Sequence, residues 1–142
     1  MEAVINHTLF QSMTCQGNES PHEEICGALL GKKNGKEIII EDYIPLTNIS
    51  DNKLVHYIPD PNEWFQVLQK TTLDKDSEIS LVGIYHTHPQ SPPIASTTDI
   101  EEAGYAGIYI IYSPRYKKAN TYYYDGDEDK RQFTKTNLKI EV

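Results

Sequence analysis

The sequence predicts one α/β or α+β domain built from a mixed sheet and two main helices. Short apolar runs separated by turn residues alternate with two segments whose apolar residues recur at helical spacing. No internal repeat or low-complexity linker interrupts this order, so residues 1–142 are expected to form a single domain. A chain of 142 residues is long enough to bury one hydrophobic core.

A helix and a β-hairpin are expected in the first part of the chain. Apolar side chains recur at helical spacing from about Ile5 to Gln16. The dipeptide Asn34-Gly35 readily adopts the positive φ values of a tight turn, and an apolar run stands on each side of it. Residues 25–43 are therefore expected to form a hairpin, and a third strand is expected near Leu54–Ile58.

The second part of the chain predicts a helix, a central strand and a short helix. Pro61–Leu73 has helical spacing and begins with the Asp-Pro pair typical of a helix start. The nearly continuous apolar run Ile79–Tyr85 predicts a strand buried on both faces. After a proline-rich loop, Thr98–Glu101 has the capping-box pattern that opens a helix. Further strands are expected at Gly107–Ser113, Ala119–Tyr124 and about Gln132–Ile140, with Tyr122, Tyr123 and Tyr124 in an edge strand.

Composition excludes several classes of protein. The net charge of −8, from 13 Lys+Arg and 21 Asp+Glu, argues against binding to a nucleic-acid phosphate backbone. No apolar run approaches the roughly 20 residues that span a bilayer, and the N-terminus has no signal-peptide pattern. A soluble cytoplasmic protein without a membrane partner is expected. Cys15 and Cys26 are too few for a disulfide framework, and a bridge between them is not expected in a reducing cytosol.

Two histidines at the end of the central strand have the spacing of metal ligands. Side chains at positions i and i+2 of a strand project from the same side, roughly 6.5–7 Å apart, so His86 and His88 can converge on one ion. Zinc in a catalytic site takes three protein ligands and keeps one position for water. Asp99 is the best third ligand, because the proline-rich loop can turn the chain back toward the strand. Two histidines at this spacing also occur often by chance, so the rest of the segment carries the argument.

The residues around these histidines resemble the JAMM motif. His86-Thr87-His88-Pro89 is followed by Ser96-Thr97-Thr98-Asp99, with ten residues, 89–98, between the second histidine and the aspartate. Upstream, Glu24-Ile25-Cys26-Gly27 resembles the Glu-x-x-Gly of the same family. The resemblance covers roughly residues 20–113 in the expected order. The chain is therefore similar to the JAMM/MPN+ zinc metallopeptidases, and to their small prokaryotic members in particular.

The resemblance implies both a fold and a mechanism. The fold would be an MPN/cytidine-deaminase-like three-layer domain, with a mixed curved sheet flanked by helices. One zinc ion per chain would be held by His86, His88 and Asp99, with water as the fourth ligand. Glu24 would accept a proton from this water and later deliver it to the departing amine, and Ser96 would donate a hydrogen bond to the oxyanion.

The resemblance also implies a substrate class. The family hydrolyses peptide or isopeptide bonds at the C-terminus of ubiquitin or of related β-grasp proteins, and small prokaryotic members resemble enzymes that act on sulfur carriers. Such a tail would bind in extended form beside an edge strand, and Asn48–Tyr57 is the candidate for one wall of the groove. Two alternatives remain open: a non-catalytic MPN-type scaffold and a RadC-like DNA-associated protein. The oligomeric state, including a homodimer, is also open.

Each candidate residue has a simpler structural interpretation as well. Glu24 could be a first-turn or strand-edge acid, and Ser96 could be a plain helix N-cap. Cys26 could be a nucleophile or a ligand, but a small buried hydrophobic residue is the better interpretation. His7, His22 and His56 lack partners at ligand spacing and are expected to be surface or core histidines.

Overall fold

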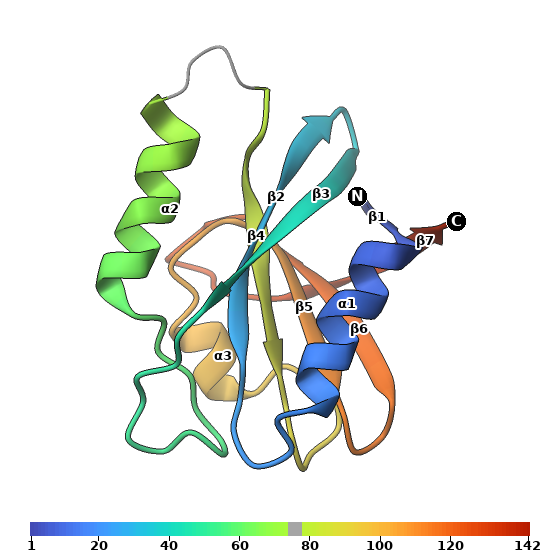
Figure 1. Cartoon of the computed structure of the whole chain (residues 1–142). Coiled ribbons are helices and arrows are strands. Elements are labelled where there is room, and N and C mark those ends of the chain that lie inside the picture. The colour runs from blue at the N-terminus through green and yellow to red at the C-terminus, as the bar shows by residue number, and fades with distance from the viewer. Residues whose placement is uncertain (74–77) are drawn as a thin grey trace.

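Seven strands and three helices make up the described part of the chain (Figure 1). The computed structural model describes residues 1–73 and 78–142. The elements follow in the order β1 (Glu2–Asn6), α1 (His7–Asn18), β2 (Cys26–Asn34), β3 (Glu37–Leu46), α2 (Pro61–Leu73), β4 (Ser80–Thr87), α3 (Thr97–Glu101), β5 (Gly107–Ser113), β6 (Lys118–Tyr124) and β7 (Thr134–Glu141). The predicted mixed α+β fold is confirmed.

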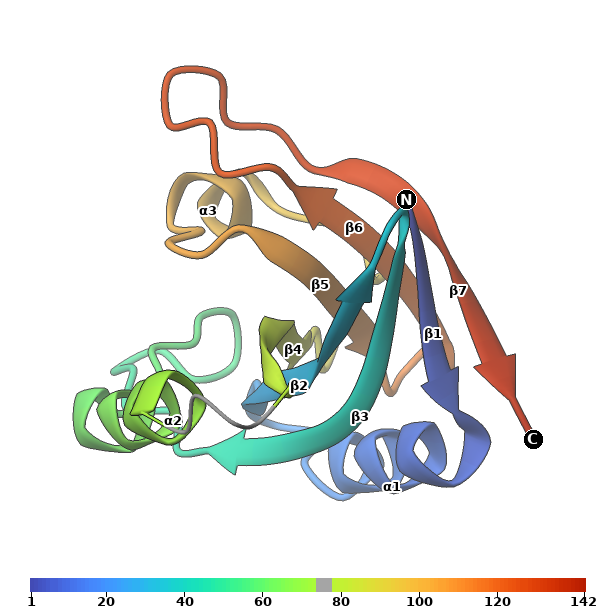
Figure 2. The ribbon, with the colours of Figure 1, turned by 90° about the horizontal axis from the view of Figure 1, so that it is seen from above.

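The sheet closes on itself, with the strand order β1-β3-β2-β4-β5-β6-β7 (Figure 2). Strand β1 runs parallel to both β3 and β7, and β4 runs parallel to β5, whereas the other neighbours are antiparallel. The ring is closed by the two ends of the chain, where Glu2 lies opposite Asn137. The resemblance implied a curved sheet as the middle layer of a three-layer domain, and the sheet instead closes into a barrel. A contact between residues this far apart has no local signal in the sequence.

Helices cover the strands on two sides. Helix α1 packs on a core cluster that contains Met13, Leu29 and Tyr85. Helix α2 contributes Val67 to a second cluster. Along β2, side chains of this second cluster alternate with side chains of the first. The segment around α3 packs on a third cluster that contains Ile84. No helix among the described residues is both long and apolar enough to cross a membrane.

The N-terminal residues differ from the sequence prediction. Ile5 was expected in a helix but lies in β1, where Ala3, Val4 and Ile5 are buried between β3 and β7. Helix α1 begins after Asn6, whose side-chain oxygen accepts a hydrogen bond from the Thr8 backbone N–H at 2.8 Å. Pairing with two strands that are distant in sequence outweighs the helical pattern of this short segment.

The hairpin and the central elements agree with the sequence. Gly35 has a φ of 64° in the turn between β2 and β3, as the Asn-Gly pair predicts. Helix α2 and strand β5 have the predicted bounds, and β4 extends through Thr87, so that His86 lies within the strand.

Two predictions about strands are wrong. Residues 54–58 form no strand, and the segment contributes only an isolated bridge between Asn48 and Pro59. Strand β6 is not an edge strand, because it pairs with both β5 and β7. Tyr122 and Tyr124 of β6 are accordingly buried, and they pack on the third core cluster.

The close approach of β4 and β5 depends on glycine at position 83. A Cβ atom built on Gly83 would lie 2.0 Å from the backbone oxygen of Ile108 in β5. Gly83→Ala is therefore expected to lower the free energy of unfolding by about 3 kcal/mol or more, because two paired backbones must move apart. Gly104→Ala, whose Cβ would meet nothing closer than 4.0 Å, should change it by less than about 0.5 kcal/mol. Urea unfolding curves measure both values, and equal stabilities would contradict the close packing.

Candidate metal centre

His86 occupies a fully buried position near the end of β4. Its side chain is 0% exposed, and Tyr57 stacks on its ring with centroids 4.4 Å apart. Nδ1 lies 3.3 Å from Oε1 of Glu24. Because a carboxylate only accepts, Nδ1 carries the proton in a neutral ring and Nε2 keeps its lone pair. Nε2 is the one buried side-chain nitrogen or oxygen atom of the described residues without a hydrogen-bond partner.

His88 presents the same nitrogen to the same space. It follows β4 directly, and its backbone N–H donates to the Tyr112 carbonyl of β5 at 2.9 Å. Nδ1 lies 2.9 Å from the carbonyl oxygen of Pro92, which can only accept, so Nδ1 again carries the proton. Nε2 is thereby directed at Oδ2 of Asp99, 3.0 Å away. Burial lowers the pKa of His88, but the hydrogen bonds to Asp99 and Pro92 outweigh it and leave that pKa raised.

Asp99 lies in the first turn of α3 and faces both histidines. Its Oδ1 is 3.8 Å from Nε2 of His86, and its Oδ2 is 3.0 Å from Nε2 of His88. Burial raises the pKa of Asp99, but the hydrogen bond with His88 and the proximity of His86 outweigh burial and hold that pKa at about 2. Asp99 is therefore a charged carboxylate at neutral pH.

Ser96 is the N-cap of α3. Its Oγ accepts a hydrogen bond from the Asp99 backbone N–H at 3.0 Å, while its own backbone N–H donates to Oδ2 of Asp99 at 2.9 Å. The capping box is thus Ser96 with Asp99, not Thr98 with Glu101 as the sequence pattern suggested. The cap orients the Asp99 carboxylate, and it leaves the hydroxyl hydrogen of Ser96 free to donate.

Glu24 reaches this cluster from the loop before β2. It is only 3% exposed and contacts Nδ1 of His86, because Cys26 lies opposite His86 in the pairing of β2 with β4. Its backbone is held on both sides: the N–H donates to the Lys53 carbonyl at 2.6 Å, and the carbonyl accepts from Nδ2 of Asn48 at 2.9 Å. A carboxylate on the second nitrogen of a metal-binding histidine orients the ring.

These four side chains fit a metal ion. One donor atom from each of Glu24, His86 and His88 lies within 4.8 Å of the others. The two Nε2 atoms and the Asp99 carboxylate meet in one space, where a bound cation would replace the proton that His88 shares with Asp99. Nitrogen and oxygen donors of this kind suit zinc. Leaving the Nε2 atom of His86 buried without a partner is costly, and a bound cation would satisfy it. The sequence therefore predicted residues that the fold does bring together.

The remaining candidates do not join the cluster. Burial raises the pKa of Cys26 to about 12, so its thiol stays protonated, and its Sγ lies 3.6 Å from the Leu46 carbonyl. Cys15 is exposed and Cys26 is buried, and both are free thiols. His7 and His22 are exposed, whereas His56 contacts Glu102 beyond the end of α3, with 2.7 Å between Nε2 and Oε2.

Asn48, which no pattern in the sequence singles out, holds the loop beside the site. The buried side chain of Asn48 bonds to the backbone of Glu24 and His56, and it accepts from the backbone N–H groups of Ser50 and Ile58. These bonds replace a strand ladder, which explains why residues 54–58 are not a strand. An asparagine two residues before a serine is typical of a turn, but nothing in its spacing points to Glu24.

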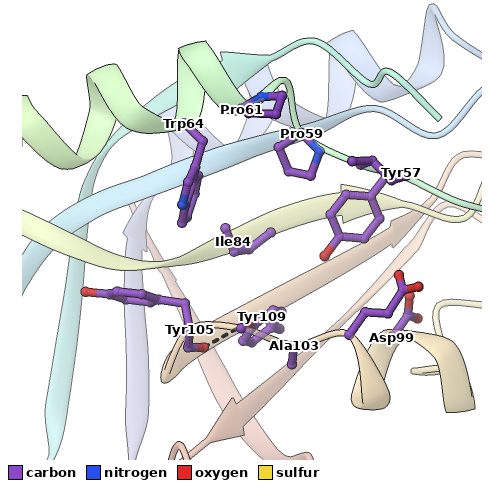
Figure 3. Close-up of a pocket in the computed structure, with 12 residues that line it drawn as sticks. Tyr57, Pro59, Pro61, Trp64, Ile84, Asp99, Ala103, Tyr105 and Tyr109 are labelled. Atoms are coloured by element: carbon purple, nitrogen blue, oxygen red, sulfur yellow. Dashed lines mark hydrogen bonds between the residues drawn. The ribbon is translucent and has the colours of Figure 1, made fainter.

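A cavity of about 480 Å³ adjoins the cluster (Figure 3). Asp99 belongs to both, and the other walls come mainly from aromatic and apolar residues, among them Tyr57, Trp64, Ile84, Ala103 and Tyr105. Tyr57 lies at the end of the segment expected to form one wall of a groove. Of that segment, Tyr57 lines the cavity, and the next residue, Ile58, lines it too.

Comparison with known proteins reveals relatives of this chain. The family profile described as prokaryotic homologs of the JAB domain matches residues 7–125. The chain is 35% identical over 95 residues to the desampylase of Haloferax volcanii, which covers 66% of this chain and 65% of the relative. It is 33% identical over 94 residues to the probable TtuB-protein conjugate cleaving protease of Thermus thermophilus, which covers 66% of this chain and 57% of the relative. The chain thus aligns with less than two thirds of either relative.

Solved structures with the same fold are more distant in sequence. The solution structure of protein DSY2949 from Desulfitobacterium hafniense has a TM-score of 0.76 at 22% identity and covers 99% of this chain and 94% of its own. A solution structure of a protein from Salinibacter ruber has a TM-score of 0.65 at 22% identity, and the match covers 99% of this chain and 91% of that one. These likenesses concern the fold alone. Together with the profile match over most of its length, the relatives establish that the chain belongs to the prokaryotic homologs of the JAB domain, which confirms its resemblance to the JAMM/MPN-type family.

Proposed function

We propose that the chain is a zinc-dependent hydrolase that cleaves a peptide or isopeptide bond at the C-terminus of a ubiquitin-like or sulfur-carrier β-grasp protein. The observation that carries the proposal is the convergence of two buried histidine Nε2 atoms and the Asp99 carboxylate, with Glu24 beside them. Such a set of groups is not needed to stabilise the fold, since buried polar atoms without partners are costly.

Zinc, about one ion per chain, would be held by His86, His88 and Asp99. When bound, zinc activates water as a nucleophile and polarises the scissile carbonyl. The carbonyl of Pro92 and the carboxylate of Glu24 hold the two imidazoles in the tautomer that directs Nε2 inward. The N-cap bonds of Ser96 hold the Asp99 carboxylate in place.

The protein's own groups would carry the proton transfers. Glu24 accepts a proton from the attacking water through the carboxylate oxygen that does not contact His86, and it then delivers this proton to the departing amine. The free hydroxyl hydrogen of Ser96 donates to the oxyanion that develops on the scissile carbonyl, a contribution of about 2.7–4 kcal/mol in comparable sites.

The names of the relatives support the substrate class. One relative is named a desampylase, and the other is named a probable protease that cleaves TtuB-protein conjugates. The net charge of −8 supports a protein substrate over a nucleic acid. The barrel leaves each strand with neighbours on both sides, so the tail would be bound beside the cavity instead of along a free edge strand. We place the enzyme in the cytoplasm, in contact with neither membrane nor nucleic acid, as a monomer or a homodimer.

A panel of β-grasp carriers tests this function. Each carrier would bear either a C-terminal peptide extension or an isopeptide-linked lysine, and mass spectrometry would locate the cut. The zinc-loaded protein is expected to cut after the carrier's last residue, and a chelator should stop the reaction until zinc is added back. A zinc-loaded protein that cuts no member of the panel would favour the non-catalytic scaffold.

A further inference from the structure

The cavity beside the metal cluster is lined by a tyrosine hydroxyl that the fold does not use. Three tyrosines line it. The Tyr105 hydroxyl donates to the Leu81 carbonyl at 3.0 Å, and the Tyr109 hydroxyl donates to the Tyr105 carbonyl at 2.7 Å. The Tyr57 hydroxyl has no hydrogen-bond partner among the described residues, although a half-buried phenol normally has one.

The position of Tyr57 is well defined. One face of its ring stacks on His86, with an angle of 25° between the two planes. Its loop is held by the side chain of Asn48 on one side and by the contact of His56 with Glu102 on the other. Figure 3 shows the hydroxyl directed away from the loop and into the cavity, above Ala103 and Tyr109. The hydroxyl is therefore a fixed hydrogen-bonding group in a mostly apolar space.

The chemistry of the cavity defines what it can bind. An apolar side chain that contacts the aromatic and aliphatic walls would stabilise the bound state by burying apolar surface. A glycine has no side chain and would bring no such stabilisation. A main-chain carbonyl that enters an apolar site needs a donor, because an unpaired carbonyl there is costly. The Tyr57 hydroxyl is such a donor, and the shared residue Asp99 makes the cavity continuous with the metal cluster.

We propose that the cavity binds one apolar residue of the substrate close to the scissile bond, and that Tyr57 donates a hydrogen bond to a main-chain carbonyl of that residue. The proposal rests on the proposed function only in taking the ligand to be a polypeptide. It makes Tyr57 a substrate-binding residue that also buttresses His86, and it predicts a preference for tails with a bulky apolar residue near the cut.

A blocked amino acid tests the site without any turnover. N-acetyl-leucine methylamide would be titrated into the ¹⁵N-labelled, zinc-loaded protein and followed by NMR. Amide shifts are expected at residues 102–105 and at Ile58, with a dissociation constant in the millimolar range. N-acetyl-glycine methylamide, which lacks the side chain, should bind at least about fivefold more weakly. Absence of shifts at these residues with the leucine probe would overturn the proposal.

Tyr57→Phe isolates the hydroxyl, because it keeps the ring that stacks on His86. The variant should keep its zinc and bind the leucine probe about three- to tenfold more weakly. Tyr105→Phe is the matched control, because the hydroxyl it removes is already bonded to Leu81, and the probe affinity should change by less than about twofold. Equal binding by wild type and Tyr57→Phe would overturn the role of Tyr57.

Kinetics on a cleaved carrier separate this proposal from the function itself. Tyr57→Phe should raise KM by about three- to tenfold with little change in kcat, because the hydrogen bond is made equally in the bound substrate and in the transition state. Unchanged KM on a conjugate that the wild type cleaves would contradict the proposal while the function stands. If no conjugate is cleaved, the function fails, and the probe titration still decides whether the site exists.

Discussion

Replacing Glu24 with glutamine is expected to lower kcat by about 10²–10⁴-fold while the protein keeps its zinc. Glutamine has nearly the same shape as glutamate, and its amide oxygen can still accept the hydrogen bond from Nδ1 of His86. The amide cannot take a proton from water, so the substitution removes the base and preserves the packing. The measurement is kcat on a conjugate that the wild type cleaves, together with zinc content by elemental analysis.

The contact between Glu24 and His86 gives this experiment a second informative outcome. If Glu24 only orients the imidazole, the variant should bind zinc about 10–100-fold more weakly, and excess zinc should restore its turnover. Restoration by zinc would contradict the assignment of Glu24 as the base. Glu23→Gln is the matched control, because it makes the same change at the adjacent exposed residue. It should leave both zinc content and kcat unchanged.

Replacing His88 with alanine is expected to weaken zinc binding by more than about 100-fold and to abolish hydrolysis. Loss of a group that only orients a ligand already costs about 10–100-fold in affinity, and loss of the ligand itself costs more. The substitution removes the Nε2 atom directed at Asp99, whose carboxylate keeps its hydrogen bond from the Ser96 backbone N–H. Zinc stoichiometry after dialysis, measured by elemental analysis, checks the prediction.

His7→Ala is the control for this experiment, because His7 is exposed at the start of α1, far along the chain from the cluster. It should keep about one zinc per chain. Circular dichroism must show that His88→Ala is folded, so that loss of zinc reports on the ligand and not on the fold. Full zinc retention by a folded His88→Ala protein would show that the ligand set is wrong.

Local patterns were sufficient for most of the elements around the site. The helix Pro61–Leu73, the strand Gly107–Ser113 and the turn at Asn34-Gly35 follow from spacing and turn chemistry, and the structure has them where they were predicted. The two-residue period of a strand likewise determines that His86 and His88 are near each other, whatever surrounds them.

Patterns that depend on distant partners were not predictable. The sequence pattern predicts a helix at Ile5, because the pairing of β1 with β3 and β7 leaves no local signal. The sequence predicts an edge strand for the tyrosines of β6, because closure of the barrel involves the two ends of the chain and has no local signal. Residues 54–58 have strand-forming side chains, but the hydrogen bonds of Asn48 hold their backbone in a loop.

The sequence predicts which groups the candidate site contains: two histidines at strand spacing, an aspartate and a serine at a helix start, and a glutamate upstream. How these groups face one another follows from the fold. The pairing of β2 with β4 brings Glu24 to Nδ1 of His86, and the carbonyl of Pro92 sets the tautomer of His88. The reason is physical: spacing along one element follows from local backbone geometry, whereas contacts between elements depend on the packing of the whole domain.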